Sequence, residues 1–252
     1  MISQTQNITE KFKSESWKLF DEISPRYDFL NRLLSLGQDL KWRERLAWYL
    51  PSGENLKVLD VATGTADVLL EIAKADERVM RACGIDLAKN MLELGRKKVE
   101  QNGLTNIIEL KPGDANQIPF PDQSFDVVTI AFGIRNMSQP QKVLLEMFRV
   151  LKDGGRILVL EFSLAQNFFI RALQLFYLRV LVPTIGFIFS GHFRAYKYLN
   201  QTIESFPYGP KFLSALKDCG FAELIEHPLM HGAATIYQGN RIKPAKECPW
   251  VC

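Results

Sequence analysis

Short apolar runs alternate with helical patterns over most of the chain. The runs are rich in Val, Ile and Leu, and we expect a strand at each of them: 57–62, 80–86, 107–111, 125–131, 156–162 and 233–238. Apolar residues at spacings of three and four predict helices between these runs, at 67–74, 88–101, 141–151 and 212–216. Strands that are apolar throughout are typical of a parallel sheet with both faces covered by helices. The pattern therefore predicts an α/β fold with a Rossmann-like, doubly wound, mostly parallel sheet.

The pattern changes at the two ends and in one long insertion. Residues 14–50 have helical spacing that is interrupted by Pro25, which predicts two or three short helices. Residues 164–210 form an apolar, helical insertion after the fifth strand, and residues 241–252 are expected to be a loose tail. No linker or internal repeat divides residues 1–252, so we expect a single domain.

The insertion is apolar without being a good candidate for a membrane span. A membrane-spanning helix needs about 20 consecutive, mostly apolar residues. The most apolar stretch here, 168–189, contains Arg171, Arg179 and Pro183. We therefore expect this segment to form helices that pack on the domain.

Composition and charge restrict the partners and the compartment. Lys and Arg total 31 against 28 Asp and Glu, which gives a net charge of +3, and these charges are scattered rather than clustered. That distribution argues against nucleic-acid binding. Four cysteines are too few for a disulfide scaffold and the first residues lack an apolar signal sequence, so we expect a cytoplasmic protein. His192, His227 and His231 lack companion ligands at metal-binding spacing, so no metal site is predicted.

The first candidate site residues follow the first predicted strand, in the run VLDVATGTAD at 58–67. The strand ends near Asp60, and small residues around Gly64 turn the chain into a helix. In open α/β sheets, ligands bind in the crevice outside the carboxyl ends of the strands. The run lacks the glycines of a GxGxxG motif, so alone it is a weak signal.

Acidic residues at the ends of the next two strands strengthen this signal. Asp86 ends the second strand and can accept hydrogen bonds from both ribose hydroxyls of a nucleoside, with capping of the following helix as the alternative. Asp114 follows the third strand, where it can accept from an adenine amino group or form a turn. Three acids at three successive strand ends, Asp60, Asp86 and Asp114, are more specific than any one of them.

This arrangement resembles the class I S-adenosylmethionine-dependent methyltransferases. The runs PFPDQSFDVV (119–128) and RVLKDGGRILVLEF (149–162) resemble later motifs of that superfamily. The resemblance implies a seven-stranded sheet and S-adenosylmethionine as the cofactor. An acidic crevice suits its sulfonium cation, whereas a nicotinamide dinucleotide needs a helix N-terminus that approaches its pyrophosphate.

Three segments resemble a narrower family, the demethylmenaquinone and 2-polyprenyl-6-methoxybenzoquinol C-methyltransferases of quinone biosynthesis. They are YDFLNRLLSLGQDLKW (27–42), FGIRNMS (132–138) and the apolar insertion, within a resemblance that covers about residues 14–239. It implies methyl transfer from S-adenosylmethionine to a ring carbon of a reduced, prenylated quinone.

The same resemblance implies particular cofactor contacts. These map onto Thr65, Asp86, Asp114 and Ala115. Some ubiquinone-branch members have a cofactor-contacting serine where this chain has Ala131, which favours the menaquinone branch and leaves the ubiquinone branch as the alternative.

The chain also offers residues for the chemical step. Arg135 and Asn136, after the fourth strand, are expected to face the methyl acceptor, where an arginine stabilises phenolate charge without acting as a base. A water held by Arg135, or the carboxylate of Asp67, can take the phenolic proton. Tyr27 and Asn31 can orient the ring. The alternatives are a salt bridge for Arg135 at a helix start, and helix packing or capping for Tyr27 and Asn31.

The helical segments outside the sheet are candidates for substrate binding. Residues 14–50 are expected to cap the substrate site, and the apolar insertion to form a groove or lid for the prenyl tail. Arg171 and Arg179 can then meet lipid head groups in a peripheral membrane contact. A homodimer interface or ordinary core is the alternative use of the insertion.

Three other functions stay open on the sequence alone. The first is a methyltransferase that acts on another lipid-like acceptor, and the second is a binding module that has lost catalysis. The third is a nucleotide-dependent oxidoreductase.

Overall fold

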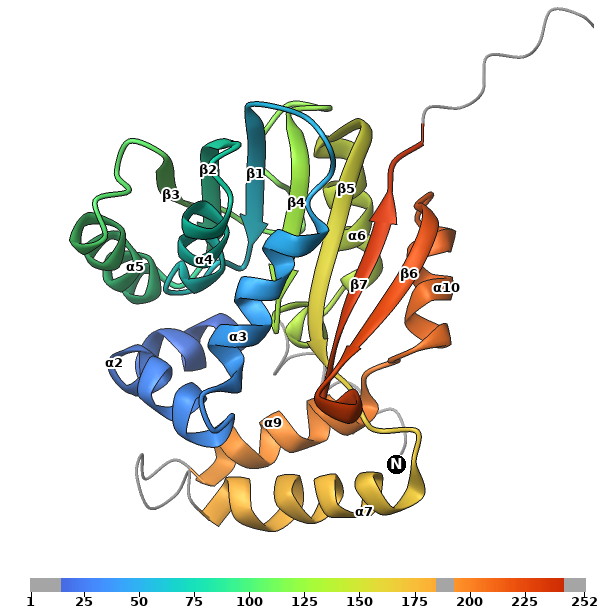
Figure 1. The fold of residues 1–252 in the computed structure, drawn as a ribbon. Coiled ribbons are helices and arrows are strands. Elements are labelled where there is room, and N and C mark those ends of the chain that lie inside the picture. Colours follow the sequence, from blue (N-terminus) through green and yellow to red (C-terminus); the bar gives the residue numbers. More distant parts are fainter. Residues whose placement is uncertain (1–14, 185–192, 243–252) are drawn as a thin grey trace, which may run out of the picture.

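The computed structural model describes residues 15–184 and 193–242, which form one α/β fold (Figure 1). The described residues do not include 185–192 of the apolar insertion, where His192 lies, or 243–252 of the expected tail.

A seven-stranded sheet forms the centre of the fold, in the order β3-β2-β1-β4-β5-β7-β6. Its strands are β1 (Leu56–Val61), β2 (Val79–Asp86), β3 (Ile108–Pro112), β4 (Phe125–Ala131), β5 (Leu151–Phe162), β6 (Ala222–Leu229) and β7 (Ala234–Asn240). The first five strands pair in parallel, and β7 is antiparallel to both β5 and β6. The predicted mostly parallel, seven-stranded sheet is thus confirmed. The sequence pattern did not locate β6, because this edge strand mixes exposed and half-buried positions and contains Pro228.

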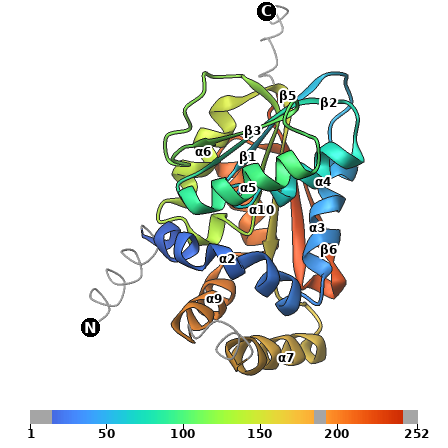
Figure 2. The ribbon, with the colours of Figure 1, turned by 90° about the vertical axis from the view of Figure 1, so that its left-hand side faces the viewer.

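Helices cover both faces of the sheet (Figure 2). They are α4 (Asp67–Ala75), α5 (Lys89–Gln101), α6 (Pro140–Val150) and α10 (Pro210–Asp218). Neighbouring residues of one strand bury into opposite layers, as Val58 packs with α4 and α5 whereas Leu59 packs with α6 and α10. Because side chains alternate across a strand, this confirms the doubly wound arrangement.

The N-terminal segment forms α2 (Ser16–Leu34), α3 (Gln38–Glu44) and a short 3-10 helix, η1 (Arg45–Tyr49). The expectation that Pro25 separates two helices is wrong, because α2 continues through position 25 and ends before Gly37, whose φ is +73°. Tertiary contacts hold α2 on both sides of the proline. Asp21 accepts a hydrogen bond from the Asn90 backbone N–H, and Asp28 accepts one from the Thr65 hydroxyl. These contacts offset the hydrogen bond that the proline removes.

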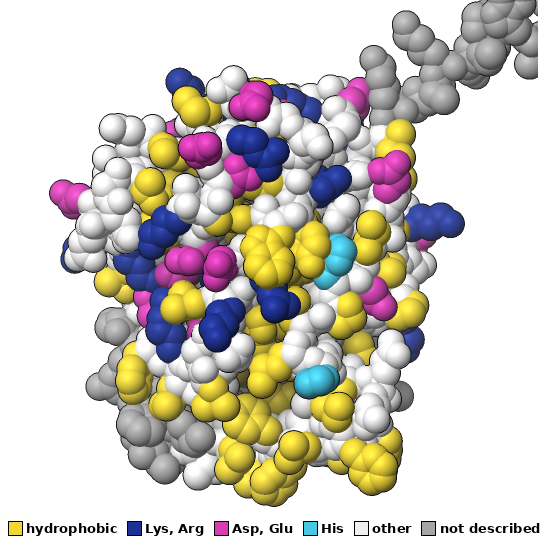
Figure 3. Space-filling model, in the orientation of Figure 1, with side chains coloured by type: hydrophobic (Ala, Val, Ile, Leu, Met, Phe, Trp, Pro, Cys, Tyr) yellow, Lys and Arg dark blue, Asp and Glu magenta, His cyan; other side chains and the backbone are white. Residues whose placement is uncertain are grey.

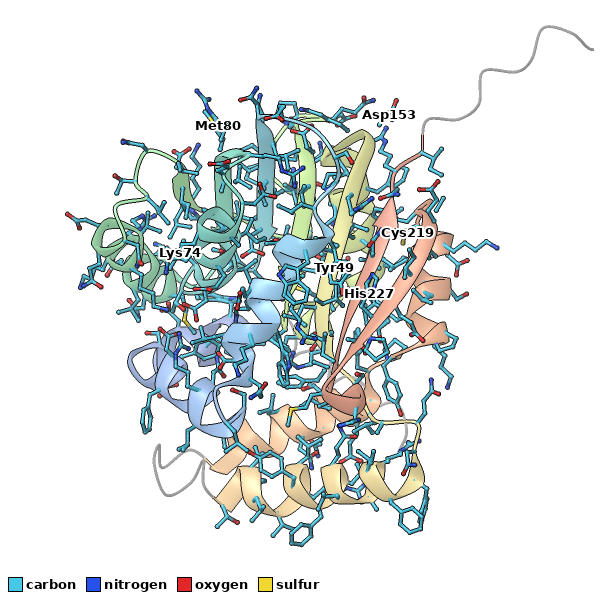
Figure 4. The ribbon with its side chains drawn as sticks, viewed as in Figure 1. Tyr49, Lys74, Met80, Asp153, Cys219 and His227 are labelled. Carbon is cyan, nitrogen blue, oxygen red and sulfur yellow. The ribbon has the colours of Figure 1, made fainter. Side chains whose placement is uncertain are left out.

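η1 joins the N-terminal helices to the far strands of the sheet. The ring of Tyr49 stacks on the ring of His227 in β6, with 3.9 Å between the centroids (Figure 4). The guanidinium of Arg156, in β5, donates to the backbone oxygen of Tyr49. The N-terminal helices are therefore attached to α5 and the β1–α4 turn through α2, and to the sheet through η1.

The apolar insertion forms α7 (Phe168–Phe176), a short π-helical continuation η3 (Tyr177–Leu181) and α9 (Phe193–Ser205). The side chain of Asn167 caps α7 by accepting from the backbone N–H groups of Phe169 and Ile170. These helices lie beyond the carboxyl ends of the parallel strands, next to α2 (Figures 1 and 2). Within residues 15–184 and 193–242, no helix is long and apolar enough to span a membrane.

Candidate functional site

The turn between β1 and α4 has an unusual backbone. Ala62, Gly64 and Ala66 have positive φ values of 53°, 56° and 66°. A Cβ built on Gly64 would have no atom within 4 Å, so the chain leaves open space beside this residue. Positive φ is unfavourable for alanine, and such strain is typically found at functional sites.

Asp86, at the end of β2, fixes this turn. One carboxylate oxygen accepts from the backbone N–H of Gly64 at 2.8 Å, and the other from that of Ala88 at 2.9 Å. Burial raises the pKa of the Asp86 carboxyl, while the backbone N–H groups act in the opposite direction. Asp86 therefore makes a cap-like contact at the start of α5 and also holds the glycine turn.

The ends of four strands and α2 enclose a cleft. Its walls include Gly64, Asp86, Asp114, Ala115, Asn116, Ala131, Phe20 and Tyr27. No Lys or Arg belongs to the described residues that line it. The Asn116 side-chain oxygen is buried without a hydrogen-bond partner in the described part of the chain. These groups suit an uncharged nucleoside and a cation, and they offer no cationic side chain for a phosphate.

Asp60 lies behind the cleft rather than in its wall. Its side chain accepts a hydrogen bond of 2.6 Å from the Thr129 hydroxyl, and the residue is 1% exposed. Burial raises the pKa of Asp60 to about 7, with the Thr129 hydrogen bond acting in the opposite direction. Of the three predicted acids, Asp86 and Asp114 line one cleft and Asp60 lies beneath it.

Thr65 is held from behind the turn. Its hydroxyl donates to Asp28 of α2 at 2.8 Å and lies 2.9 Å from the Lys98 ammonium of α5. The residue is 3% exposed and is not part of the cleft wall. The structure therefore gives Thr65 a supporting position between the turn and α2.

Asp67 belongs to the same ionic cluster. Its carboxylate lies 2.5 Å from Lys98 and 3.3 Å from Arg32, and Lys98 also pairs with Asp28. Burial alone would raise the pKa of Asp67, but Lys98 and the arginines outweigh this effect and lower it. A carboxylate with a lowered pKa is a poor proton acceptor, and Asp67 lines neither the cleft nor the neighbouring cavity.

A large apolar cavity of about 530 Å³ adjoins the cleft. Four residues line both spaces: Phe20, Tyr27, Phe132 and Asn136. The cavity continues between α2, α3, α7, η3 and α9, with walls that include Leu34, Trp42, Phe162, Ile170, Leu173, Tyr177 and Leu199. A cleft that carries carboxylate and amide groups therefore meets an apolar cavity at one junction.

Arg135 lies at this junction, in the 3-10 helix η2 (Ile134–Asn136) after β4. Its Nη1 donates to Glu161 of β5 at 2.5 Å and to the backbone oxygen of Phe132 at 2.7 Å. The guanidinium also lies over the ring of Phe162. The buried Nε has no hydrogen-bond partner in the described part of the chain. The salt bridge expected as the alternative for Arg135 thus exists, and the same residue lines the cavity.

Two aromatic residues shape the junction. Burial raises the pKa of the Tyr27 phenol, while Arg43 lowers it. Phe132 has a φ of +56° and is 7% exposed, with its ring packed against Phe162 and Trp42. A left-handed backbone is strongly unfavourable for a bulky residue. The surrounding side chains therefore hold this ring in place. Asn31, predicted to contact substrate, lines the cavity as well.

Two residues of this region were not predicted from the sequence. Glu161 is fully buried, and burial raises the pKa of its carboxyl although Arg135 opposes the shift. An acid in the otherwise apolar run ILVLEF was a usable signal for it. Lys98 lies on a helix with several exposed cations, so its pattern did not distinguish it. Within the described residues, no cluster of His, Cys, Asp and Glu could hold a metal ion.

The fold and the cleft define a class of protein. Seven strands in this order, with the nucleoside-compatible cleft at their carboxyl ends, form the fold of class I methyltransferases. A SAM-dependent methyltransferase from Thermotoga maritima has the same fold, with a TM-score of 0.62 at 18% identity over 89% of this chain and 99% of the other. A SAM-dependent methyltransferase from Aquifex aeolicus gives 0.55 at 20% identity, over 79% and 89%.

The chain belongs to the ubiE/COQ5 methyltransferase family, whose family model matches residues 8–241. It is 43% identical to the ubiquinone/menaquinone biosynthesis C-methyltransferase UbiE of Geotalea daltonii, over 93% of this chain and 99% of that one. It is 39% identical to the demethylmenaquinone methyltransferase of Thermotoga maritima, over 92% and 98%. The predicted enzyme class, an S-adenosylmethionine-dependent methyltransferase, is confirmed by these findings.

Proposed function

We propose that this chain transfers a methyl group from S-adenosylmethionine to a ring carbon of a prenylated demethylquinol in menaquinone biosynthesis. The observation that carries the proposal is the position of Arg135. Arg135 lines an apolar cavity that meets the cofactor cleft at Phe132 and Asn136, and Glu161 holds its guanidinium in place. A ring bound there has a cationic donor at its oxygen and a hydrophobic space for its tail.

The cleft residues fit S-adenosylmethionine, which supplies the electrophilic methyl group. Asp86 would accept from the ribose hydroxyls, while Asp114 would accept from the adenine amino group. Gly64 and Ala115 give the nucleoside close access to the backbone. Burial favours the protonated form of Asp60 beneath the cleft, and a bound sulfonium would favour its ionised form. Thr65 would support the turn from its bonds with Asp28 and Lys98.

The acceptor ring would lie at the junction, where Arg135 acts on its oxygen. Loss of the phenolic proton increases electron density at the ortho carbon, and an arginine donor stabilises the phenolate. Asn136 and Tyr27 would orient the ring, with Asn31 farther along the cavity wall. Because Arg135 stays protonated and Asp67 is held by cations, water beside Arg135 is the proton acceptor in this proposal.

The helical segments around the cavity would bind the rest of the substrate. The described part of residues 14–50 would cap the junction through α2, and the described part of residues 164–210 would enclose the prenyl tail as a lid. Burial of a tail in an apolar cavity contributes about 0.8 kcal/mol per CH₂ group. Because a prenylated quinol dissolves in the bilayer, the proposal includes peripheral contact with a membrane. A homodimer through the same insertion is the competing arrangement.

The branch of quinone biosynthesis rests on one position in the cleft. Ala131 lines the cleft where some ubiquinone-branch enzymes have serine. The curated relatives include proteins named for both branches and proteins named for demethylmenaquinone alone. A methyltransferase for ubiquinone or for another lipid-like acceptor is the second candidate.

Complementation tests the branch. A bacterial strain that makes both quinones and lacks this methylation step would express the chain, and mass spectrometry would profile its quinones. Restored menaquinone with persistent demethylated ubiquinone precursor supports the menaquinone branch. Restoration of ubiquinone alone, or of neither quinone, contradicts the proposal.

An assay with purified protein tests the role of Arg135. The Arg135→Met variant should lose about 10²- to 10³-fold in kcat with a demethylmenaquinol, as expected for a lost charge-stabilising donor. The Arg135→Lys variant keeps the charge without the planar guanidinium and should recover only part of the loss. Binding of S-adenosylhomocysteine should be unchanged in both. Full activity of Arg135→Met would overturn the assignment.

A further inference from the structure

The outer face of α7 is apolar and exposed. None of the nine residues of α7 is buried. Phe168, Phe169, Leu173 and Phe176 are 76%, 80%, 69% and 54% exposed, and Val180 continues the row at 46%. We call these five residues the α7 ridge. Positions 169, 173, 176 and 180 recur at the spacing of one helix face, and hydrophobic side chains gather along this edge of the molecule (Figure 3).

Exposed apolar area of this kind needs a partner. Single exposed apolar residues are ordinary on a protein surface, whereas a continuous apolar patch indicates contact with a protein or a membrane. The charged residues beside the ridge help to decide between a protein partner and a membrane. Residues 166–184 contain Arg171 and Arg179 and no Asp or Glu. Arg171 is exposed, and Arg179 pairs with Glu204 of α9.

The inner face of the same helix forms part of the cavity wall. Ile170, Gln174 and Tyr177 line the cavity. Gln174 accepts from the backbone N–H of Ala165, and the Tyr177 hydroxyl donates to the backbone oxygen of Leu34 at 2.7 Å. These bonds fix the orientation of the helix relative to the domain.

The ridge and the cavity are continuous. Leu173 and Phe176 line the cavity and are also more than half exposed. An alkyl chain in the cavity can therefore reach the outer surface between these two apolar side chains without contacting polar groups.

We propose that the α7 ridge is a membrane-docking surface that inserts into the interface of an anionic bilayer and takes the prenyl tail directly from the lipid phase. An amphipathic helix with cations beside its apolar face lies in the plane of the interface, with that face among the acyl chains. The tail uptake rests on the proposed function, whereas the docking does not.

A second copy of the chain is a poorer occupant of this surface. A symmetric dimer places the same patch against itself, so the exposed Arg171 beside one ridge would lie near that of the other copy, whereas Arg179 is already paired with Glu204. Anionic lipid head groups compensate these charges instead.

Vesicle sedimentation with the full chain tests the docking. The protein should bind vesicles of phosphatidylcholine and phosphatidylglycerol more tightly than vesicles of phosphatidylcholine alone. The double variant Phe168→Glu/Phe169→Glu should bind the anionic vesicles at least tenfold more weakly. Neither phenylalanine lines the cavity, so the site stays intact. The matched control is Met80→Glu, because Met80 is 54% exposed on β2, at the far end of the molecule (Figure 4).

A comparison of substrates tests the tail uptake. The double variant should methylate a water-soluble, short-tailed demethylquinol like the unmodified chain. Its kcat/KM for a long-tailed quinol in vesicles should fall at least tenfold. Equal loss on both substrates, or no loss on either, overturns the uptake.

The outcomes separate this proposal from the function on which it rests. Absence of vesicle binding, or equal binding of the double variant, overturns the docking even if quinols are methylated. A dimer that the double variant dissociates, with vesicle binding unchanged, makes the ridge a subunit interface and overturns the docking. Vesicle binding without methylation of any quinol supports the docking and contradicts the proposed function.

Discussion

Arg135 and Glu161 form an ion pair in which the side chains are 4% and 0% exposed. They come from η2 and β5, so the contact depends on the pairing of β4 with β5. Glu161 and the backbone oxygen of Phe132 both accept from Nη1, so the guanidinium of a cavity-lining arginine is held from the sheet. Glu161 is therefore a positioning residue that orients the guanidinium without touching the substrate space.

The Glu161→Gln variant should lower kcat for quinol methylation about 10- to 100-fold. The neutral amide holds the guanidinium less firmly, and breaking a buried ion pair destabilises a protein by about 3–5 kcal/mol. The measurement is kcat and KM below the melting temperature, together with thermal unfolding. Glu161→Asp should recover part of kcat, and a double-mutant cycle with Arg135→Met should show strong non-additivity. Additive effects would contradict a shared role.

Asp86→Asn should weaken binding of S-adenosylhomocysteine about 10- to 100-fold. The change removes the charge-assisted acceptors for the ribose hydroxyls and loosens the Gly64 turn. Calorimetry measures the affinity. Asp122→Asn is the matched control, since Asp122 is an exposed carboxylate that pairs with Arg149 away from the cleft. If both variants bound S-adenosylhomocysteine equally well, Asp86 would not be a cofactor-binding residue.

Asp60 should make the free energy of unfolding fall as the pH rises. Its pKa is about 7 in the folded chain against 3.8 as the ordinary value, so the folded state keeps a proton that the unfolded state has lost. The stabilisation is complete below pH 3.8 and is lost as the pH rises through 7, by about 1.4 kcal/mol per pH unit within that window.

Urea unfolding between pH 5 and 8 checks the Asp60 prediction. The difference in unfolding free energy between the unmodified chain and Asp60→Asn should fall up to pH 7 and level off above it. Asp76→Asn is the control, because Arg78 lowers the pKa of Asp76 and keeps it ionised over this range. A constant difference for Asp60→Asn would show that Asp60 ionises normally.

Lys98→Met should weaken cofactor binding about tenfold and make the N-terminal helices less firmly attached. Lys98 pairs with both Asp67 and Asp28 and lies beside the Thr65 hydroxyl, so its loss leaves two neighbouring carboxylates without their shared cation. Calorimetry and proteolysis within α2 measure the two effects. Lys97→Met, at an exposed position of the same helix, should change neither.

The strand ends and their acids were predictable because the information is local. An apolar run fixes a buried strand, and the parallel arrangement brings the strand ends to one edge of the sheet. Asp86 and Asp114 therefore meet in one cleft, as predicted, and the same reasoning placed Arg135 and Asn136 next to it.

Features set by distant contacts were not predictable in the same way. Glu161 meets Arg135 only because β5 lies beside β4, and Lys98 meets Asp28 only because α2 packs on α5. Pro25 is a helix breaker by local propensity, yet contacts on both sides keep α2 continuous. In each case tertiary packing outweighs the local pattern.

The left-handed backbone of Phe132 has a wider consequence. Phe132 lines both the cleft and the apolar cavity, and the chain retains this residue at a conformational cost of about 1–3 kcal/mol. Replacement by glycine would relax the main chain and open a path for solvent towards the methyl donor. Loss of this buried ring costs about 3–5 kcal/mol of packing, which exceeds the backbone strain, so heat resistance and the separation of the two spaces both favour phenylalanine at this position.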